Sequence, residues 1–194
     1  MLTILFDGIA YGMLLFILAC GLTITLGLMN FINLAHGAFA MTGGYVTVVL
    51  MNRYGVSFYW CLPAAFLVSA ALGGILERTL YRRLYQASHL DQVLFSVGLV
   101  FMSVAAADYI MGGQQQLIQL PAELSGRMEI FGAGIGRYRL FTIIICAVLA
   151  LALQLILSKT RFGSRLRAAV DDRRVAMGLG INVSAVFALT FAFG

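Results

Sequence analysis

The sequence predicts an all-α fold, a polytopic transmembrane helix bundle with about five spans and the start of a sixth. The prediction rests on composition, on the length of the apolar runs and on the placement of charge between them. Of the 194 residues, 61% are apolar and 11% are charged, whereas soluble domains have about 45–50% apolar and about 25% charged residues. The mean hydropathy is +0.95. One soluble domain has too little interior to bury this excess, so a soluble, disordered or disulfide-rich secreted protein is excluded.

Five apolar runs approach the roughly 20 residues that a helix needs to cross the hydrocarbon core. The second run is interrupted by His36 and by two adjacent glycines. A sixth run begins at Val183, and its 12 residues would rise only about 18 Å as a helix. Either the natural chain continues past Gly194, which we expect because no stop-transfer charges follow, or the last segment is re-entrant and packs against a partner. The five predicted spans are residues 8–29, 34–51, 56–76, 92–110 and 140–158.

The distribution of charge predicts the orientation of the spans. The loop 77–91 carries three Arg and the loop 159–182 carries six basic residues, so the positive-inside rule assigns both to the cytoplasm. The loop 111–139 and the amino terminus are then external, and we expect a short hairpin over 128–140. If the second apolar run is re-entrant, the amino terminus is inside instead. The net charge is +5. The basic residues lie beside the spans and are not interleaved with aromatic residues, so no nucleic-acid partner is predicted.

The most informative polar stretch follows the first apolar run. Asn30, Asn33 and His36 recur every three residues, so on a helix they fall within one arc of about 120°. Gly37 follows them. Unsatisfied polar groups cost several kcal/mol in lipid, so these side chains should face protein or water. Two interpretations remain open: a wall of a solute pathway, or a capping and inter-helix hydrogen-bond cluster.

The remaining polar candidates in and beside the spans have simpler expectations. Asp7 and Asp108 lie near span ends, where a carboxylate can reach the interface. Glu77 has Arg78 and Arg82 nearby in sequence, which predicts a local ion pair. The three cysteines lie in apolar runs without metal-ligand spacing. We therefore expect no metal site and no cofactor.

The basic loop 159–182 predicts a short cytoplasmic helix between two spans. Ser164 is a plausible N-cap for about four turns ending at Met177, and Gly178 and Gly180 provide flexible exits. The helix would carry a narrow, mainly apolar stripe. This helix either receives force from a soluble partner or lies on anionic lipid. The stripe consists of Leu166, Ala169, Val170, Arg173 and Met177.

Four segments, in the same order along the chain, resemble branched-chain amino acid ABC-transporter permeases. They are residues 27–45, which contain Asn-Phe-Ile-Asn-Leu-Ala-His-Gly, then 76–84, 160–168 and 176–182. Arg83 stands where that family often has proline. The resemblance is greater to the first of the two paired permeases than to the second.

The resemblance implies a single transmembrane permease domain over 1–194, in the bacterial inner membrane. Such a chain is a pore-forming subunit of an ATP-driven importer of branched-chain amino acids. Its partners would be a second permease subunit, cytoplasmic ATP-binding subunits, a periplasmic or lipid-anchored solute-binding protein and the lipid bilayer. The sequence has no Gly-x-x-x-x-Gly-Lys-Ser/Thr motif, so we expect no ATPase site and no enzyme. The alternatives are a permease for urea, short amides or other small organic solutes, a non-transporting fragment, or a secondary transporter.

The resemblance also implies roles for residues at matching positions. The pathway candidates are Asn30, Asn33, His36 and Gly37. The candidates for coupling to an ATPase lie in the loop 159–182: Arg161, Gly163, Arg167, Ala168, Asp171, Ala176, Gly178 and Gly180.

Overall fold

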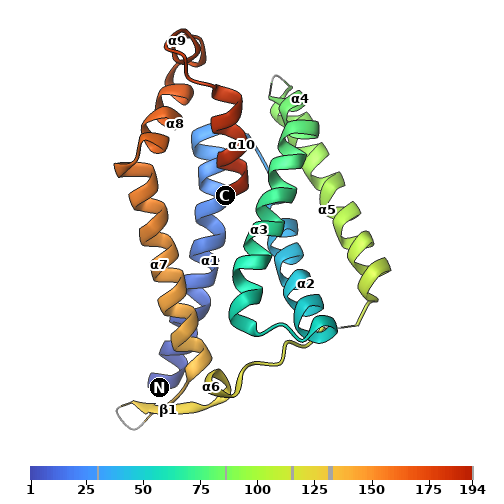
Figure 1. The fold of residues 1–194 in the computed structure, drawn as a ribbon, viewed down its shortest axis with the longest axis vertical. Helices are drawn as coiled ribbons and strands as arrows, with labels where there is room; N and C mark the ends of the chain where they lie inside the picture. The colour runs from blue at the N-terminus through green and yellow to red at the C-terminus, as the bar shows by residue number, and fades with distance from the viewer. Residues whose placement is uncertain (30, 86, 115, 131–132, 194) are drawn as a thin grey trace. The chain divides into compact units, whose positions relative to one another are not determined.

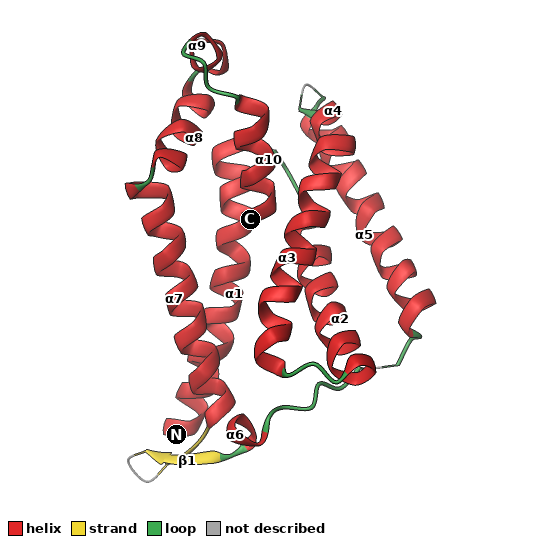
Figure 2. Cartoon of the chain, in the orientation of Figure 1, coloured by secondary structure: helices red, strands yellow, loops and turns green. Residues whose placement is uncertain are grey.

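A computed structural model of the chain describes residues 1–29, 31–85, 87–114, 116–130 and 133–193, and within them the fold is all-α, as predicted (Figure 1; Figure 2). A two-stranded sheet is the only β-structure in these ranges. The helices, one of them a π-helix (η1), are α1 (Leu2–Met29), α2 (His36–Tyr54), α3 (Phe58–Leu76), η1 (Glu77–Tyr81), α4 (Arg82–Leu84), α5 (His89–Met111), α6 (Ala122–Ser125), α7 (Arg137–Lys159), α8 (Arg161–Asp171), α9 (Arg173–Gly178) and α10 (Val183–Phe193).

Four helical segments in the described residues are long and apolar enough to cross a membrane: Thr3–Gly27, Phe58–Leu84, His89–Met111 and Arg137–Lys159. The predicted second span corresponds to α2, which is not among them. The third span is longer than predicted, because η1 and α4 continue α3 without a break. Residues 77–84 are therefore helical where a loop was expected, and this correction matters for the site.

The chain forms two compact units, of which the first contains residues 1–20 and 119–164. It holds the start of α1, α6, α7 and the hairpin of β1 (Arg127–Ile130) and β2 (Ala133–Gly136). The strands pair antiparallel with Arg127 opposite Gly136, which confirms the predicted hairpin. An ion pair joins Asp7 of α1 to Arg139 of α7. It brings the N-terminal ends of two apolar helices together, and it neutralises one arginine of the predicted external loop.

The second unit contains residues 21–118 and 165–194. Helices α2 and α3 form an antiparallel pair, in which the Ser69 hydroxyl donates to the Phe39 carbonyl (3.4 Å). Gly55 ends α2 with φ of 63°, a left-handed conformation that glycine adopts readily. Helix α10 packs on α3 at Gly73, where a Cβ atom would lie 3.1 Å from the Phe191 carbonyl oxygen. Glycine thus permits this close approach.

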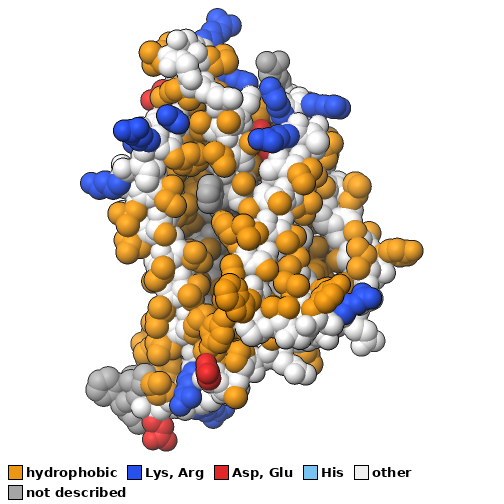
Figure 3. All heavy atoms as spheres, viewed as in Figure 1, with side chains coloured by type: hydrophobic (Ala, Val, Ile, Leu, Met, Phe, Trp, Pro, Cys, Tyr) orange, Lys and Arg blue, Asp and Glu red, His pale blue; other side chains and the backbone are white. Residues whose placement is uncertain are grey.

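Basic side chains gather at one end of the second unit. Helices α4 and α9, which contain two arginines each, lie toward this end (Figure 1). The space-filling view shows blue side chains there and mainly orange side chains over the long helices (Figure 3). This arrangement is the one that the positive-inside rule requires of two loops on the cytoplasmic side.

Candidate functional site

The centre of the candidate site in the second unit is a short non-helical segment, residues 31–35, which we call the linker loop. It connects α1 to α2. Phe31 and Asn33 are each 1% exposed. The Asn33 Oδ1 atom accepts hydrogen bonds from the Ala35 backbone N–H and from the Tyr81 hydroxyl, both at 3.1 Å. The amide side chain therefore fixes the turn that starts α2 and ties it to η1.

Gln92, in the first turn of α5, holds the linker loop from the other side. Its Oε1 atom accepts from the Ile32 N–H at 3.1 Å, and its Nε2 group donates to the carbonyls of Leu84 and Ala87 at 3.2 and 3.4 Å. The side chain is 2% exposed. One amide thereby satisfies three backbone groups in two segments, the linker loop and the turn at Leu84–Ala87.

Aromatic rings surround the linker loop. The Phe31 ring meets Tyr81 and Phe191 edge-on at centroid distances of 5.2 and 5.9 Å. Tyr85 also contacts Phe31, at 5.8 Å, and Phe187 of α10, at 5.7 Å. Edge-to-face pairs at these distances contribute about 0.5–1.5 kcal/mol each beyond the area they bury. The loop is thus packed between η1, α4 and α10.

Glu77 begins η1 and is 1% exposed. Its Oε1 atom accepts a hydrogen bond of 2.7 Å from the Tyr85 hydroxyl. The predicted ion pair with Arg78 or Arg82 is wrong: among the described residues Glu77 has no ion pair, because the π-helix turns its carboxylate inward. Burial, and then the hydrogen bond to Glu77, raise the pKa of Tyr85 above its usual 10, so the phenol stays protonated and able to donate.

The predicted pathway residues do not share one helical arc. Asn30 lies outside the described residues. Asn33 is in the linker loop, whereas His36 is the half-buried first residue of α2 and Gly37 is exposed. Residues 31–35, between α1 and α2, are not helical, and the Asn33 side chain accepts from the Ala35 N–H within this turn. The hydrogen bonds of Asn33 are those of the capping and inter-helix alternative, and a contact with solute stays a prediction.

The predicted coupling helix is two helices, α8 and α9, and not one continuous helix over 164–177. Asp172 separates them: its Oδ1 atom accepts from the N–H groups of Arg174 and Val175 at 2.8 and 3.0 Å, as an N-cap. Ser164 is inside α8 and is not its N-cap. The Thr160 Oγ1 atom instead accepts from the Gly163 N–H at 3.3 Å.

The apolar stripe predicted for this segment is also interrupted at Asp172. Leu166 and Ala169 of α8 are buried, whereas Val170 and Met177 are exposed. Beyond the break, α9 and the residue after it expose three apolar side chains. These are Val175 at 58%, Met177 at 51% and Leu179 at 74%.

The eight coupling candidates differ in environment. A Cβ atom on Gly163 would overlap the Leu157 backbone, so this glycine permits the corner between α7 and α8. Gly180 has φ of 79° and ends α9, whereas a Cβ atom on Gly178 would meet nothing within 4 Å. Of the others, Ala176 is buried and Ala168 is half-buried. The exposed candidates are Arg161, Arg167 and Asp171.

Sequence reasoning missed the residues that hold the linker loop. The sequence predicts a span that starts at Gln92, and it places Tyr81 and Tyr85 in the loop 77–91. The two tyrosines are four residues apart, so they lie near one face of a continuous helix. This spacing would indicate their shared environment if the third span is extended through residue 85. The contact with α10 has no local signal.

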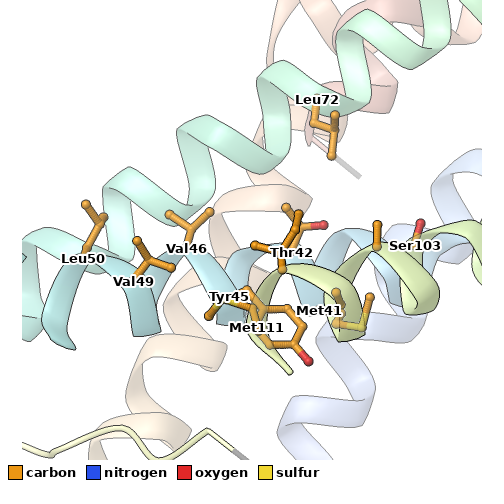
Figure 4. A pocket seen from close by; sticks show the side chains of 12 residues that line it. Met41, Thr42, Tyr45, Val46, Val49, Leu50, Leu72, Ser103 and Met111 are labelled. Carbon is orange, nitrogen blue, oxygen red and sulfur yellow. The ribbon is translucent and has the colours of Figure 1, made fainter. Parts of the chain in front are cut away.

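A hollow of about 420 Å³ opens between α2, α3 and α5 (Figure 4). Its lining is almost entirely apolar and contains no charged residue. The hydroxyls of Thr42 and Ser103 donate to carbonyls of their own helices, at 2.9 and 2.7 Å. The hollow therefore offers mainly apolar contact and no charged partner for an ammonium or carboxylate group.

The fold and this arrangement define a multi-pass membrane protein with an internally braced break between two helices. The sequence profile described as the branched-chain amino acid transport system / permease component matches residues 4–194. The chain therefore belongs to this permease family. No solved structure matches it.

The chain is similar to several permease proteins over part of their length. It is 29% identical over 204 residues to the high-affinity branched-chain amino acid transport system permease protein LivH of Salmonella typhimurium, which covers 98% of this chain and 65% of the relative. The probable LivH of Methanocaldococcus jannaschii is 33% identical, over 93% of this chain and 58% of the relative. LivM of Salmonella typhimurium is 34% identical over 56% of this chain and 25% of the relative. The chain thus spans just under two thirds of the length of the LivH protein of Salmonella.

Proposed function

We propose that this chain is a pore-forming permease subunit of an ATP-driven importer of branched-chain amino acids in the bacterial inner membrane. The match to the permease family over nearly the whole chain carries the proposal. Relatives named LivH and LivM both match, which supports pairing with a second permease subunit. A solute-binding protein would deliver the solute, and separate ATP-binding subunits would supply the energy.

We propose that α9 is the contact with the ATP-binding subunit. It follows a basic amphipathic helix, lies at the basic end of the second unit and exposes Val175, Met177 and Leu179 beside Arg173 and Arg174. Apolar side chains rimmed by cations fit a protein groove with an acidic edge, because the apolar centre is desolvated and the rim charges steer the encounter. The buried Ala176 and the left-handed Gly180 would set the angle at which α9 is presented.

Co-purification tests this contact. The chain is expressed with its ATP-binding subunit, and the pair is isolated in detergent with residues 164–180 intact or replaced by a Gly/Ser linker. We expect binding to be lost with the linker and with Leu179→Asp. Leu117→Asp is the matched control, because Leu117 is equally exposed (74%) but lies after α5, on the predicted external side. Equal binding by Leu179→Asp and Leu117→Asp would contradict the proposal.

Uptake tests the substrate class. With all partner subunits present, labelled leucine should enter vesicles only when ATP is supplied, and unlabelled isoleucine and valine should compete. Competition by urea or acetamide in place of the branched-chain amino acids would instead assign the small-amide alternative. Uptake driven by an ion gradient without ATP would refute the importer.

A further inference from the structure

The segment that follows α9 reaches the linker loop directly. After α9 the chain turns at Gly180 and enters α10, whose Phe187 and Phe191 are 8% and 6% exposed. Phe191 lies 4.9 Å from the Tyr81 ring and 5.9 Å from the Phe31 ring, measured between centroids. If α9 moves and carries α10 with it, the rings of α10 must therefore either slide past the linker loop or displace it.

Glu77 and Tyr85 form the polar part of the same junction. The Tyr85 ring contacts Phe31 of the linker loop on one side and Phe187 of α10 on another, while its hydroxyl is fixed to the Glu77 carboxylate. The nearby guanidinium groups belong to Arg82 of α4 and Arg173, the first residue of α9. One side chain thus touches both the linker loop and α10 and is anchored to η1.

The π-helical geometry of η1 is the third observation. A π-helix is rare and usually marks a local rearrangement at a functional position. Here it directs Glu77 and Tyr81 inward, with exposures of 1% and 0%. Tyr81 then bonds Asn33, and Glu77 bonds Tyr85.

We propose that Glu77 and Tyr85 are positioning residues that transmit a displacement of α9, through α10, to the linker loop. The inference rests on the proposed function, in which an ATP-binding subunit moves α9. Packed rings and a buried hydrogen bond resist shear, so displacement at one end is relayed and not absorbed. The relay depends on the hydrogen bond from the Tyr85 hydroxyl, not on the negative charge of Glu77.

A double-mutant cycle on the purified full chain tests the relay without any partner. Asp172→Ala removes the N-cap of α9, a loss of about 1 kcal/mol, and we expect it to speed hydrogen exchange of the linker-loop amides of Ile32 and Ala35 about fivefold. In a Tyr85→Phe background, which keeps the ring, Asp172→Ala should add less than twofold. The proposal would be overturned if the two substitutions changed the exchange rates by independent factors that multiply. It would also be overturned if Asp172→Ala left the exchange of the linker-loop amides unchanged.

The assembled importer gives the second readout. In Tyr85→Phe the ATP-binding subunit should still co-purify and hydrolyse ATP, while uptake per ATP falls about fivefold, the loss expected for a typical intramolecular hydrogen bond. Tyr109→Phe is the matched control, because Tyr109 is 92% exposed on α5. Glu77→Gln keeps an acceptor and should retain uptake, whereas Glu77→Leu should not. Wild-type uptake per ATP in Tyr85→Phe would overturn the relay.

The two experiments separate failure of the relay from failure of the proposed function. If the wild-type assembly neither binds an ATP-binding subunit nor takes up leucine, the proposed function is wrong, and the exchange cycle still decides whether α9 and the linker loop are coupled. If the assembly transports but the cycle shows independent effects, the function stands and the relay is wrong.

Discussion

Replacing Gln92 with alanine should destabilise the second unit more than any other single change in a polar side chain of α5. The substitution leaves the Ile32 N–H without its acceptor and the carbonyls of Leu84 and Ala87 without their donor. A buried group left unpaired costs about 1–3 kcal/mol. The Ile32 and Leu84 bonds are the shorter two, so we expect a total loss of about 3 kcal/mol.

The chain carries its own reporters for this measurement. Cys61 and Cys146 are buried thiols, 0% and 4% exposed, and they lie in the second and first units respectively. In detergent, a thiol reagent can label a buried cysteine only after local opening of the structure. A loss of about 3 kcal/mol in the free energy of opening corresponds to roughly a hundredfold faster labelling. Peptide mass spectrometry then assigns each label. Gln92→Ala should accelerate labelling of Cys61 far more than labelling of Cys146.

Gln154→Ala is the control for loss of a polar side chain from an apolar helix, because Gln154 is exposed on α7. It should leave both labelling rates within about twofold, as for other surface substitutions. If Gln92→Ala labels Cys61 no faster than Gln154→Ala does, the amide does not hold the linker loop, and the account of the site given above is refuted.

Three further changes have definite expected outcomes. Gly163→Ala should distort the corner between α7 and α8 and reduce co-purification of the ATP-binding subunit, whereas Gly178→Ala, whose Cβ atom meets nothing within 4 Å, should not; equal binding would contradict this. Gly180→Ala should cost about 1–2 kcal/mol of local stability, because φ is 79°; unchanged hydrogen exchange across α9 would argue against it. Asp7→Asn should change stability by less than about 1 kcal/mol, because its ion pair with Arg139 is partly exposed; a larger shift in a thermal unfolding curve would show that the pair is structural.

The fold class could be predicted because membrane insertion constrains composition directly. Long uncharged runs must be helices in lipid, since every backbone group has to be satisfied within the segment. The hairpin at 127–136 was predictable for a similar reason, since short alternating segments separated by glycine favour local pairing. Both signals are local, and they do not depend on which helices come together.

The details of the site depend on contacts between distant segments, and these have no local signal. Residues 77–84 look like a basic loop because they carry three arginines, yet Glu77 and Tyr81 are among the most buried residues. Tyr81 is packed against Asn33 and Phe191, which lie 48 and 110 positions away from it in the sequence. The break between α8 and α9 does have a local cause, because the Asp172 side chain accepts from the N–H groups of Arg174 and Val175 as an N-cap. The predicted continuous helix over 164–177 leaves this cap out.

The two interpretations of the Asn30–Gly37 region now make different demands on Asn33. Among the described residues, no buried side-chain nitrogen or oxygen lacks a hydrogen-bond partner. The Asn33 Oδ1 atom is already shared by the Ala35 N–H and the Tyr81 hydroxyl. A solute could therefore bind this oxygen only after Tyr81 withdraws, which requires η1 to change. A pathway role for Asn33 and a relay through η1 thus require the same movement. The displacement of η1 that would free the Asn33 Oδ1 atom is the displacement that α10 would transmit.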